Sequence, residues 1–136
     1  MDTEINPFQA IPPAHKKRVL FVITQSEFGG AQQFVFQFLK NAPKDAFDFD
    51  VAVGSDGDGS FTQTLAALGI PVFILPNLRR DIHPISDLKA VREIRQLITK
   101  LKPDTLFLNS SKAGFVGALA AHGRGPLNVI YRIGGW

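Results

Sequence analysis

Cysteine is absent from this chain of 136 residues. Its absence excludes disulfide bridges, thiolate metal sites and cysteine nucleophiles, and it leaves the redox compartment open. No apolar run approaches the roughly 20 residues that a membrane-spanning helix needs, so we expect any membrane contact to be peripheral. Lys and Arg number 15 against 12 Asp and Glu, a net charge of +3. This excess is too small and too dispersed to predict nucleic-acid binding.

The start of the chain also lacks the apolar core of a signal peptide, and its sequence, MDTEINPFQAIPPAHK, is acidic and then rich in proline. We therefore expect residues 1–16 to form a flexible leader. Residues 17–136 are expected to form one domain, which is long enough to bury a hydrophobic core. The predicted location is the cytoplasm, with peripheral contact at the inner face of the membrane.

Apolar runs alternate with segments of helical spacing along the rest of the chain. The runs predict buried strands at 19–23, 47–53, 70–75, 105–108 and 129–133. The intervening segments predict helices at 31–41, 61–68, 88–101 and 112–122, with Ser60 and Ser86 as N-caps of the second and third. This order predicts an α/β fold, a Rossmann-like parallel sheet with helices on both faces. Loop 54–60 is acidic but lacks the distal Glu of a calcium loop, so no metal site is predicted.

The segment RVLFVITQSEFGGA, residues 18–31, has the order expected of an anion site: strand, polar loop, glycine pair, helix. Glycines let the backbone approach a ligand closely, and the free N–H groups of the following helix favour a negative charge. The loop is neither GxGxxG nor a P-loop. Two hypotheses therefore stay open, a tight turn without a ligand and a phosphate site at Gly29, Gly30, Ala31 and Gln32.

Four other loops, 54–60, 76–84, 109–112 and 134–136, are expected at the carboxyl ends of the strands, where such folds bind ligands. The candidate acceptor-binding residues in or beside these loops are Asn109, Ser110, Ser111, Lys112, Arg80, His83 and Arg132. Alternatives remain for each group. Ser110 or Ser111 is also a plausible helix cap, and the segment around Arg80 is also typical of a solvated loop. An Arg at position 132, within the last strand, is costly unless it is paired, so it is either exposed at an edge or functional.

Several motifs recur in a fixed order: the GGAQ loop after the first strand, LGIPV before the third, KPD before the fourth, an SS loop after it, and VIYRIGGW at the end. In this order they resemble the N-terminal domain of the GT-B glycosyltransferases of family 4, over about residues 17–136. The resemblance implies two Rossmann-like domains that face each other across a cleft. The sugar acceptor binds mainly to the first domain and the nucleotide-sugar donor mainly to the second.

The resemblance implies that this chain is the acceptor-side part of a retaining glycosyltransferase whose acceptor is a saccharide or a lipid-linked sugar. The donor domain, with its E-x7-E segment, lies outside the 136 residues. We therefore expect an incomplete domain that is inactive alone and associates with itself through its uncovered edge. The family often has a His where this chain has Gly134, so no catalytic residue is assigned.

The resemblance further implies that the nucleotide sugar is a substrate and that neither a cofactor nor a metal is needed. Two alternatives to the enzyme remain. One is a non-catalytic α/β module that binds a phosphorylated ligand or a partner chain. The other is a flavodoxin-like or receiver-type fold, of which the receiver is disfavoured because no acidic pair follows the first strand.

Overall fold

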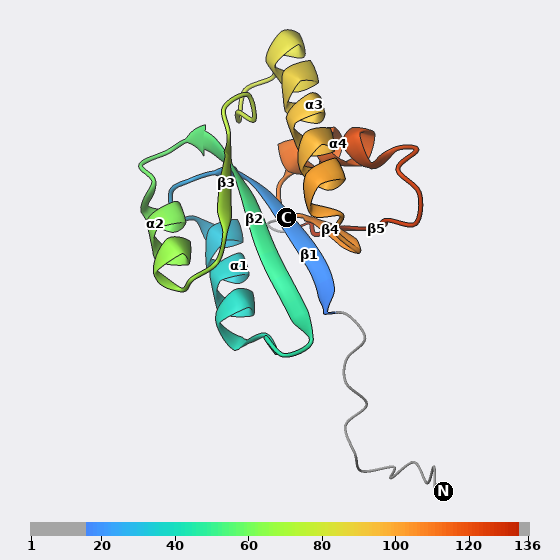
Figure 1. Cartoon of the computed structure of the whole chain (residues 1–136). Coiled ribbons are helices and arrows are strands. Elements are labelled where there is room, and N and C mark those ends of the chain that lie inside the picture. The colour runs from blue at the N-terminus through green and yellow to red at the C-terminus, as the bar shows by residue number, and fades with distance from the viewer. Residues whose placement is uncertain (1–15, 134–136) are drawn as a thin grey trace, which may run out of the picture.

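The computed structural model describes residues 16–133, which form a five-stranded parallel sheet between two layers of helices (Figure 1). The strands are β1 (Lys17–Gln25), β2 (Phe47–Asp56), β3 (Val72–Leu75), β4 (Thr105–Leu108) and β5 (Asn128–Tyr131). The helices are α1 (Gly30–Asn41), α2 (Ser60–Ala67), α3 (Pro84–Leu101) and α4 (Ser111–Ala121). The strand order β3-β2-β1-β4-β5 confirms the predicted Rossmann-like architecture. The expected leader up to His15, and Gly134 to Trp136, lie outside the described residues.

The central strand β1 divides the core into two parts. Leu20 and Val22 point into the cluster formed with α3 and α4, whereas Phe21 and Ile23 point into the cluster formed with α1 and α2. All four side chains are fully buried. A central parallel strand is covered on both faces, and for this reason its sequence is an unbroken apolar run.

Phenylalanines fill the core on the α1 side. The ring of Phe21 stacks on Phe107 with centroids 5.0 Å apart and also contacts Phe38 and Phe49. Phe36 lies on another side of α1, where it meets Phe28 edge to face at 6.2 Å. Phe34 and Phe36 therefore lie on different sides of α1 but pack against the same core cluster.

The predicted caps of two helices are wrong. Ser60 is the first residue of α2, and the N-cap is Gly59, whose φ of 80° lies in the left-handed region that glycine favours. The third helix begins at Pro84, four residues before the predicted start, and its N-cap is His83 rather than Ser86. Proline suits a first helical position because it needs no N–H partner there. The earlier start carries α3 beyond the end of the sheet, and Leu88, in its second turn, is 71% exposed.

None of the four helices in residues 16–133 is both long and apolar enough to cross a membrane.

Candidate active site

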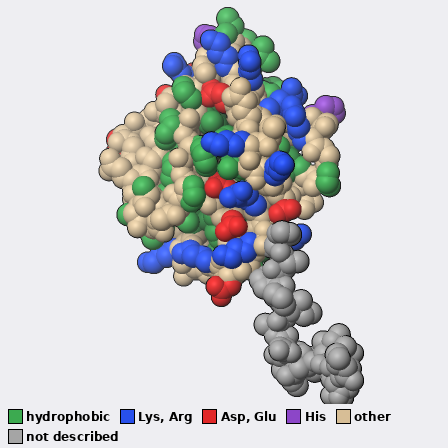
Figure 2. Space-filling view, viewed as in Figure 1, with side chains coloured by type: hydrophobic (Ala, Val, Ile, Leu, Met, Phe, Trp, Pro, Cys, Tyr) green, Lys and Arg blue, Asp and Glu red, His purple; other side chains and the backbone are tan. Residues whose placement is uncertain are grey.

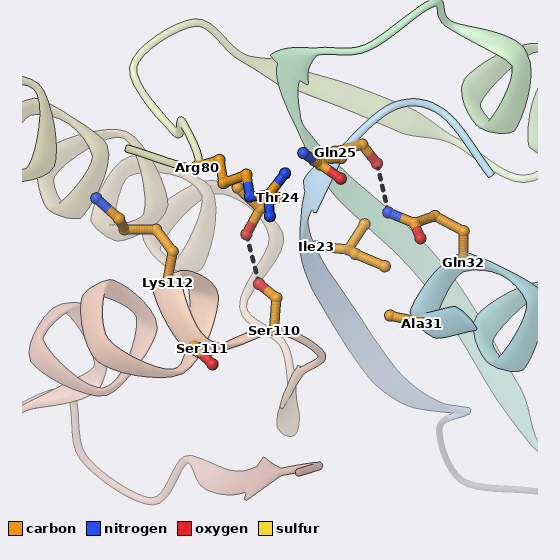
Figure 3. Close-up of a pocket in the computed structure, with 9 residues that line it drawn as sticks. All are labelled: Ile23, Thr24, Gln25, Ala31, Gln32, Arg80, Ser110, Ser111 and Lys112. Atoms are coloured by element: carbon orange, nitrogen blue, oxygen red, sulfur yellow. Dashed lines mark hydrogen bonds between the residues drawn. The ribbon is translucent and has the colours of Figure 1, made fainter. Parts of the chain in front are cut away.

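The site forms where β1 and β4 lie side by side at the middle of the sheet. From β1 the chain turns to α1 on one face, and from β4 it turns to α4 on the other. The N-termini of both helices therefore face the gap between the two strand ends, and the first N–H groups of a helix have no partner within it. A cleft of about 470 Å³ opens here (Figure 3), and it is lined by Ile23, Thr24, Gln25, Ala31, Gln32, Arg80, Ser110, Ser111 and Lys112.

A second hollow of about 370 Å³ adjoins this cleft on the side of β5. Its lining residues are Gly30, Ala31, Asn109, Ser110, Ser111, Tyr131, Arg132 and Ile133. The cleft and the hollow share Ala31, Ser110 and Ser111. The starts of α1 and α4 thus contribute to both, and a ligand longer than one sugar can extend from one into the other.

Nine of the predicted site residues line the cleft or the hollow: Gly30, Ala31, Gln32, Arg80, Asn109, Ser110, Ser111, Lys112 and Arg132. The structure does not bring the other two into either space. Gly29 is the N-cap of α1. His83 caps α3, and its Nδ1 accepts a hydrogen bond of 3.2 Å from the backbone N–H of Ser86. Nδ1 of His83 could therefore contact a ligand only if it gave up its hydrogen bond at the start of α3.

Ser110 ties the start of α4 to the end of β1. Its hydroxyl accepts a hydrogen bond of 3.1 Å from the N–H of Ala113 and is also hydrogen-bonded to the hydroxyl of Thr24. Figure 3 shows this second bond crossing from β1 to α4. The interpretation of Ser110 as a cap is confirmed, while the neighbouring Ser111 is exposed at the rim of both spaces.

Gln32 plays the corresponding part at α1. It is 5% exposed, and its Nε2 donates a hydrogen bond of 2.9 Å to the carbonyl oxygen of Gln25. This bond ties the first turn of α1 to the end of β1. Gln32 therefore shapes the glycine loop, and the backbone N–H groups of Gly30 and Ala31 remain the donors that face open space.

Lys112 is turned away from the centre of the cleft, as Figure 3 shows. Its Nζ lies 2.6 Å from the carboxylate of Asp87 and 2.6 Å from the carbonyl oxygen of Asp81. The ammonium of Lys112, predicted to contact the acceptor, is therefore largely engaged by groups of the protein itself. Arg80 is exposed and, within residues 16–133, its guanidinium has no hydrogen bond or ion pair. Of these two side chains, Arg80 is the one free to meet an anion.

Arg132 follows β5 rather than lying within it, because the strand ends at Tyr131. Its guanidinium therefore avoids burial in the sheet and lies over the ring of Phe34, with Cζ 3.8 Å from the ring centroid. A cation–π contact of this kind holds the planar group in place while leaving its N–H donors available. Arg132 thus brings a positioned positive charge to the hollow beside Gly30.

Asn109 carries an unused acceptor. It is 2% exposed, and its Nδ2 donates a hydrogen bond of 3.0 Å to the carbonyl oxygen of Phe107. Its Oδ1 is buried and has no partner among the described residues. A buried acceptor without a partner is costly, and it is the atom that a ligand hydroxyl would satisfy.

Residues at the end of β1 belong to the site although they were not among the predicted site residues. Thr24 and Gln25 line the cleft, and Tyr131, at the end of β5, lines the hollow. Thr24 and Gln25 directly follow the apolar run 19–23, and this position could have identified them as site residues. Nothing in the local sequence distinguishes Tyr131, because the parallel pairing of β4 and β5 alone places it beside Leu108.

The acidic loop 54–60 serves the fold. The Asp56 carboxylate accepts the N–H of Arg80 at 3.1 Å, and the Asp58 carboxylate accepts the N–H of Ser60 at 2.9 Å. This hydrogen bond lowers the pKa of Asp58 below its usual value. In the part of the chain that the structure describes, no three His, Asp or Glu side chains gather in a way that would hold a metal ion.

Comparison with known proteins gives one family and several related folds. The family model for glycosyl transferase 4-like proteins matches residues 18–135. The UDP-Gal:alpha-D-GlcNAc-diphosphoundecaprenol alpha-1,3-galactosyltransferase of Escherichia coli is 27% identical over 121 residues, which are 89% of this chain and 30% of that enzyme. This chain therefore spans less than a third of the length of that relative.

Solved structures have the same fold. HepE of Anabaena, crystallised with UDP and glucose, is 29% identical with a TM-score of 0.60, over 83% of this chain and 29% of that one. MurG of Acinetobacter baumannii, at 18% identity, shows the fold alone, with a TM-score of 0.66 over 88% of this chain and 37% of that one. The fold is that of the N-terminal Rossmann-like domain of GT-B glycosyltransferases, and the chain belongs to the glycosyl transferase 4-like family.

Proposed function

We propose that this chain forms the acceptor-side part of a glycosyltransferase that moves a sugar from a nucleotide sugar to a lipid-linked saccharide. The observation that carries the proposal is the convergence of two helix N-termini and two arginines on adjoining spaces in a domain of this family. The related enzyme of Escherichia coli uses, by its name, UDP-galactose and a diphosphoundecaprenol-linked acceptor. These two molecules define the chemical class of substrates proposed here.

Both substrates carry a diphosphate, and the site offers groups that bind one. The N–H groups of Gly30 and Ala31 lie at the positive end of α1, beside the guanidinium of Arg132. Charge that develops on a departing diphosphate is stabilised by donors already held in position. In the proposed reaction these groups act on the diphosphate, and the nucleotide sugar approaches from a second domain across the cleft.

The acceptor sugar needs hydrogen-bond partners that fix one hydroxyl for attack. Asn109 supplies the unpaired Oδ1 as an acceptor, and Ser111 supplies an exposed hydroxyl. Arg80 faces the other end of the same opening, where it would bind a negative charge on the acceptor. The proposal gives the role of general base to none of residues 16–133.

The proposal treats the nucleotide sugar as a substrate and includes no cofactor or metal. It places the protein in the cytoplasm, at the inner face of the membrane, where a lipid-linked acceptor is accessible. The relative's lipid-linked substrate supports this location. A non-catalytic module would bind the same phosphorylated ligand but would show no transfer when combined with a donor domain.

Nuclear magnetic resonance tests the binding step directly. A soluble N-acetylglucosamine diphosphate carrying a short alkyl chain is titrated into the chain, and we expect amide shifts to cluster at residues 30–32 and 109–112. Asn109→Ala should weaken binding by about tenfold, because the ligand hydroxyl loses the acceptor Oδ1. Asn128→Ala, at an exposed position at the other end of β5, is the matched control and should bind as the wild type does. Shifts confined to other parts of the domain would contradict the proposal.

A further inference from the structure

The strand β3 lies at one edge of the sheet, and its outer side has no strand partner within residues 16–133. Its inner side pairs with β2, where the N–H of Val51 donates to the carbonyl oxygen of Pro71 at 3.0 Å. Backbone groups alternate in direction along a strand, so those of Phe73 also face β2. The N–H and C=O groups of Val72 and Ile74 therefore point out of the sheet, where another strand can pair with them.

A groove of about 530 Å³ lies beside this open edge, between β3 and α3. We refer to it as the β3 groove, and its lining residues are Val72, Phe73, Ile74, Leu75, Pro76, Glu93, Gln96, Leu97 and Lys100. Ile74 is 52% exposed, and Phe73 is partly buried against the core. Figure 2, in the same view as Figure 1, shows apolar side chains on the face that carries β3 and α3, with Lys and Arg among them. The middle of the groove is thus apolar.

The two ends of the β3 groove differ in charge. Glu93 lies near the end of β3, and its Oε1 accepts hydrogen bonds from the backbone N–H and the side chain of Asn77 at 3.1 and 2.7 Å. Its Oε2 is buried and has no partner among the described residues. Lys100 lies about two turns farther along α3, and its Nζ is 5.6 Å from the centre of the Phe73 ring. An acceptor without a donor therefore marks one end, and a cation marks the other.

A basic depression continues from the cationic end of the groove. Its lining residues are Arg92, Arg95, Gln96, Thr99, Lys100 and Arg124, so it shares Gln96 and Lys100 with the groove. Within residues 16–133 this lining holds four cations and no carboxylate. A second copy of the chain would bring the same cations against these, and like charges placed opposite each other destabilise strand pairing. The charge therefore favours an acidic occupant over a second copy.

We propose that the β3 groove binds an extended segment of a partner protein, which pairs with β3 as an added strand and carries apolar residues followed by Asp or Glu. The outward backbone groups of Val72 and Ile74 bind the main chain of this segment. Its apolar side chains pack in the middle of the groove, and its carboxylates meet Lys100 and the basic depression. A nucleic acid would match the cations but would leave the open strand edge unpaired.

Two features limit what such a segment can be. Pro71 and Pro76 border β3 and have no N–H to donate, so the added strand pairs with about four residues. The unpaired Oε2 of Glu93 calls for a hydrogen-bond donor at the end opposite the carboxylates. The partner segment is therefore short, acidic at one end and donor-bearing at the other.

The β3 groove shares no lining residue with the cleft, so this inference does not rest on the proposed function. Nuclear magnetic resonance tests it with a synthetic peptide of alternating Val and Thr that has two Glu at one end and a Lys at the other. We expect amide shifts at residues 72–75 and 96–100. A peptide with Gln in place of Glu should bind at least about fivefold more weakly.

Ile74→Pro is the test variant, because it removes an outward N–H and leaves the pairing with β2 intact. Ile74→Thr is the matched control, since it keeps this N–H at the same exposed position. The proline variant should bind the acidic peptide at least about tenfold more weakly, and the threonine variant within about threefold of the wild type. Thermal melts establish that each variant is folded.

Lys100→Glu tests the charge without altering the strand edge. It should weaken binding of the acidic peptide by about tenfold and favour a peptide with Lys in place of Glu. The proposal is overturned by a wild type without shifts at residues 72–75, by a folded Ile74→Pro that binds as the wild type does, or by equal binding of the Glu and Gln peptides. Shifts at residues 72–75 that grow with protein concentration alone would identify a second copy as the occupant and would also overturn it. Ile74→Pro should still show shifts at residues 30–32 with the soluble diphosphate sugar, so partner binding and the proposed function fail separately.

Discussion

Lys112 on α4 and Asp87 on α3 form an ion pair, with Nζ and Oδ1 2.6 Å apart and both side chains largely buried, at 10% and 14% exposure. The pair joins the starts of two neighbouring helices on one face of the sheet. It holds the loop that carries Arg80 against the start of α4. The same contact thus supports the cleft.

Breaking this pair should destabilise the protein to different extents from its two ends. Asp87→Asn removes the negative charge that pairs with the largely buried ammonium of Lys112, and we expect a loss of about 2 kcal/mol in the free energy of unfolding. Lys112→Met should cost less, because Asp87 still lies in the first turn of α3, where the helix favours a negative charge. Urea unfolding of both single variants and the double variant measures the coupling. Additive losses would show that the two charges do not interact.

Gly30 and Gly54 should respond in opposite ways to an added methyl group. A Cβ at Gly30 meets no atom within 4 Å and points into open space at the hollow, so Gly30→Ala should shift Tm by only a few degrees. Binding of the diphosphate sugar should nevertheless weaken by about tenfold, equivalent to about 1.4 kcal/mol. A Cβ at Gly54 would overlap the carbonyl oxygens of Thr24 and Leu78, so Gly54→Ala should lose its cooperative melt. Unchanged binding by Gly30→Ala would remove the glycine loop from the site.

The strand order and the two-layer core follow from patterns that the sequence displays openly. The run around Phe21 predicts a strand buried on both faces, and the regular spacing of Val91, Ile94 and Ile98 predicts a helix that covers the sheet. The helix ends were harder to predict, because capping depends on geometry that neighbouring loops impose. His83 caps α3 only because Pro84 can begin the helix, and Ser86 then lies inside it.

The sequence predicts which loops form the site, but it does not show which side chains in them are free to bind a ligand. The sheet places Gly30, Asn109 and Ser110 together, as expected for carboxyl-end loops of neighbouring strands. Whether a group is free depends on contacts between distant segments. Lys112 is occupied by residues 25 and 31 positions earlier, and the orphaned Oδ1 of Asn109 is visible only once the core is built.

The edge strand β5 should make the chain associate with itself. Every residue of β5 is exposed, and Val129, Ile130 and Tyr131 present apolar surface along a strand edge that is unpaired within residues 16–133. Such edges pair with other chains unless a charge interrupts them. We expect light scattering to show dimers or larger species whose amount rises with concentration, and Ile130→Lys to shift the chain toward monomer. A monodisperse wild-type monomer at high concentration would contradict this prediction.

Asp50 should make stability depend on pH in the direction opposite to most carboxylates. Burial raises the pKa of Asp50, although its Oδ2 lies 3.1 Å from Nε of Arg18. In the unfolded chain the carboxyl ionises near its ordinary pKa of 3.8, before it does so in the folded protein. The folded state is therefore favoured by protonated Asp50 below this value, and the advantage is lost as pH rises through the raised pKa. Relative to Asp50→Asn, the wild type should lose stability as pH rises above about 4.

Asp58 provides the control because the sign of its effect is reversed. The hydrogen bond from the N–H of Ser60 lowers the pKa of Asp58, so the unfolded chain takes up a proton before the folded protein does. The stability that ionised Asp58 contributes is present above its ordinary pKa and is lost as pH falls through the lowered one. Urea unfolding at and below about pH 4 should therefore show the wild type gaining stability relative to Asp58→Ala as pH rises toward the ordinary pKa of 3.8, with little change above it. Parallel pH profiles for the two aspartate variants would show that burial does not govern the ionisation of Asp50.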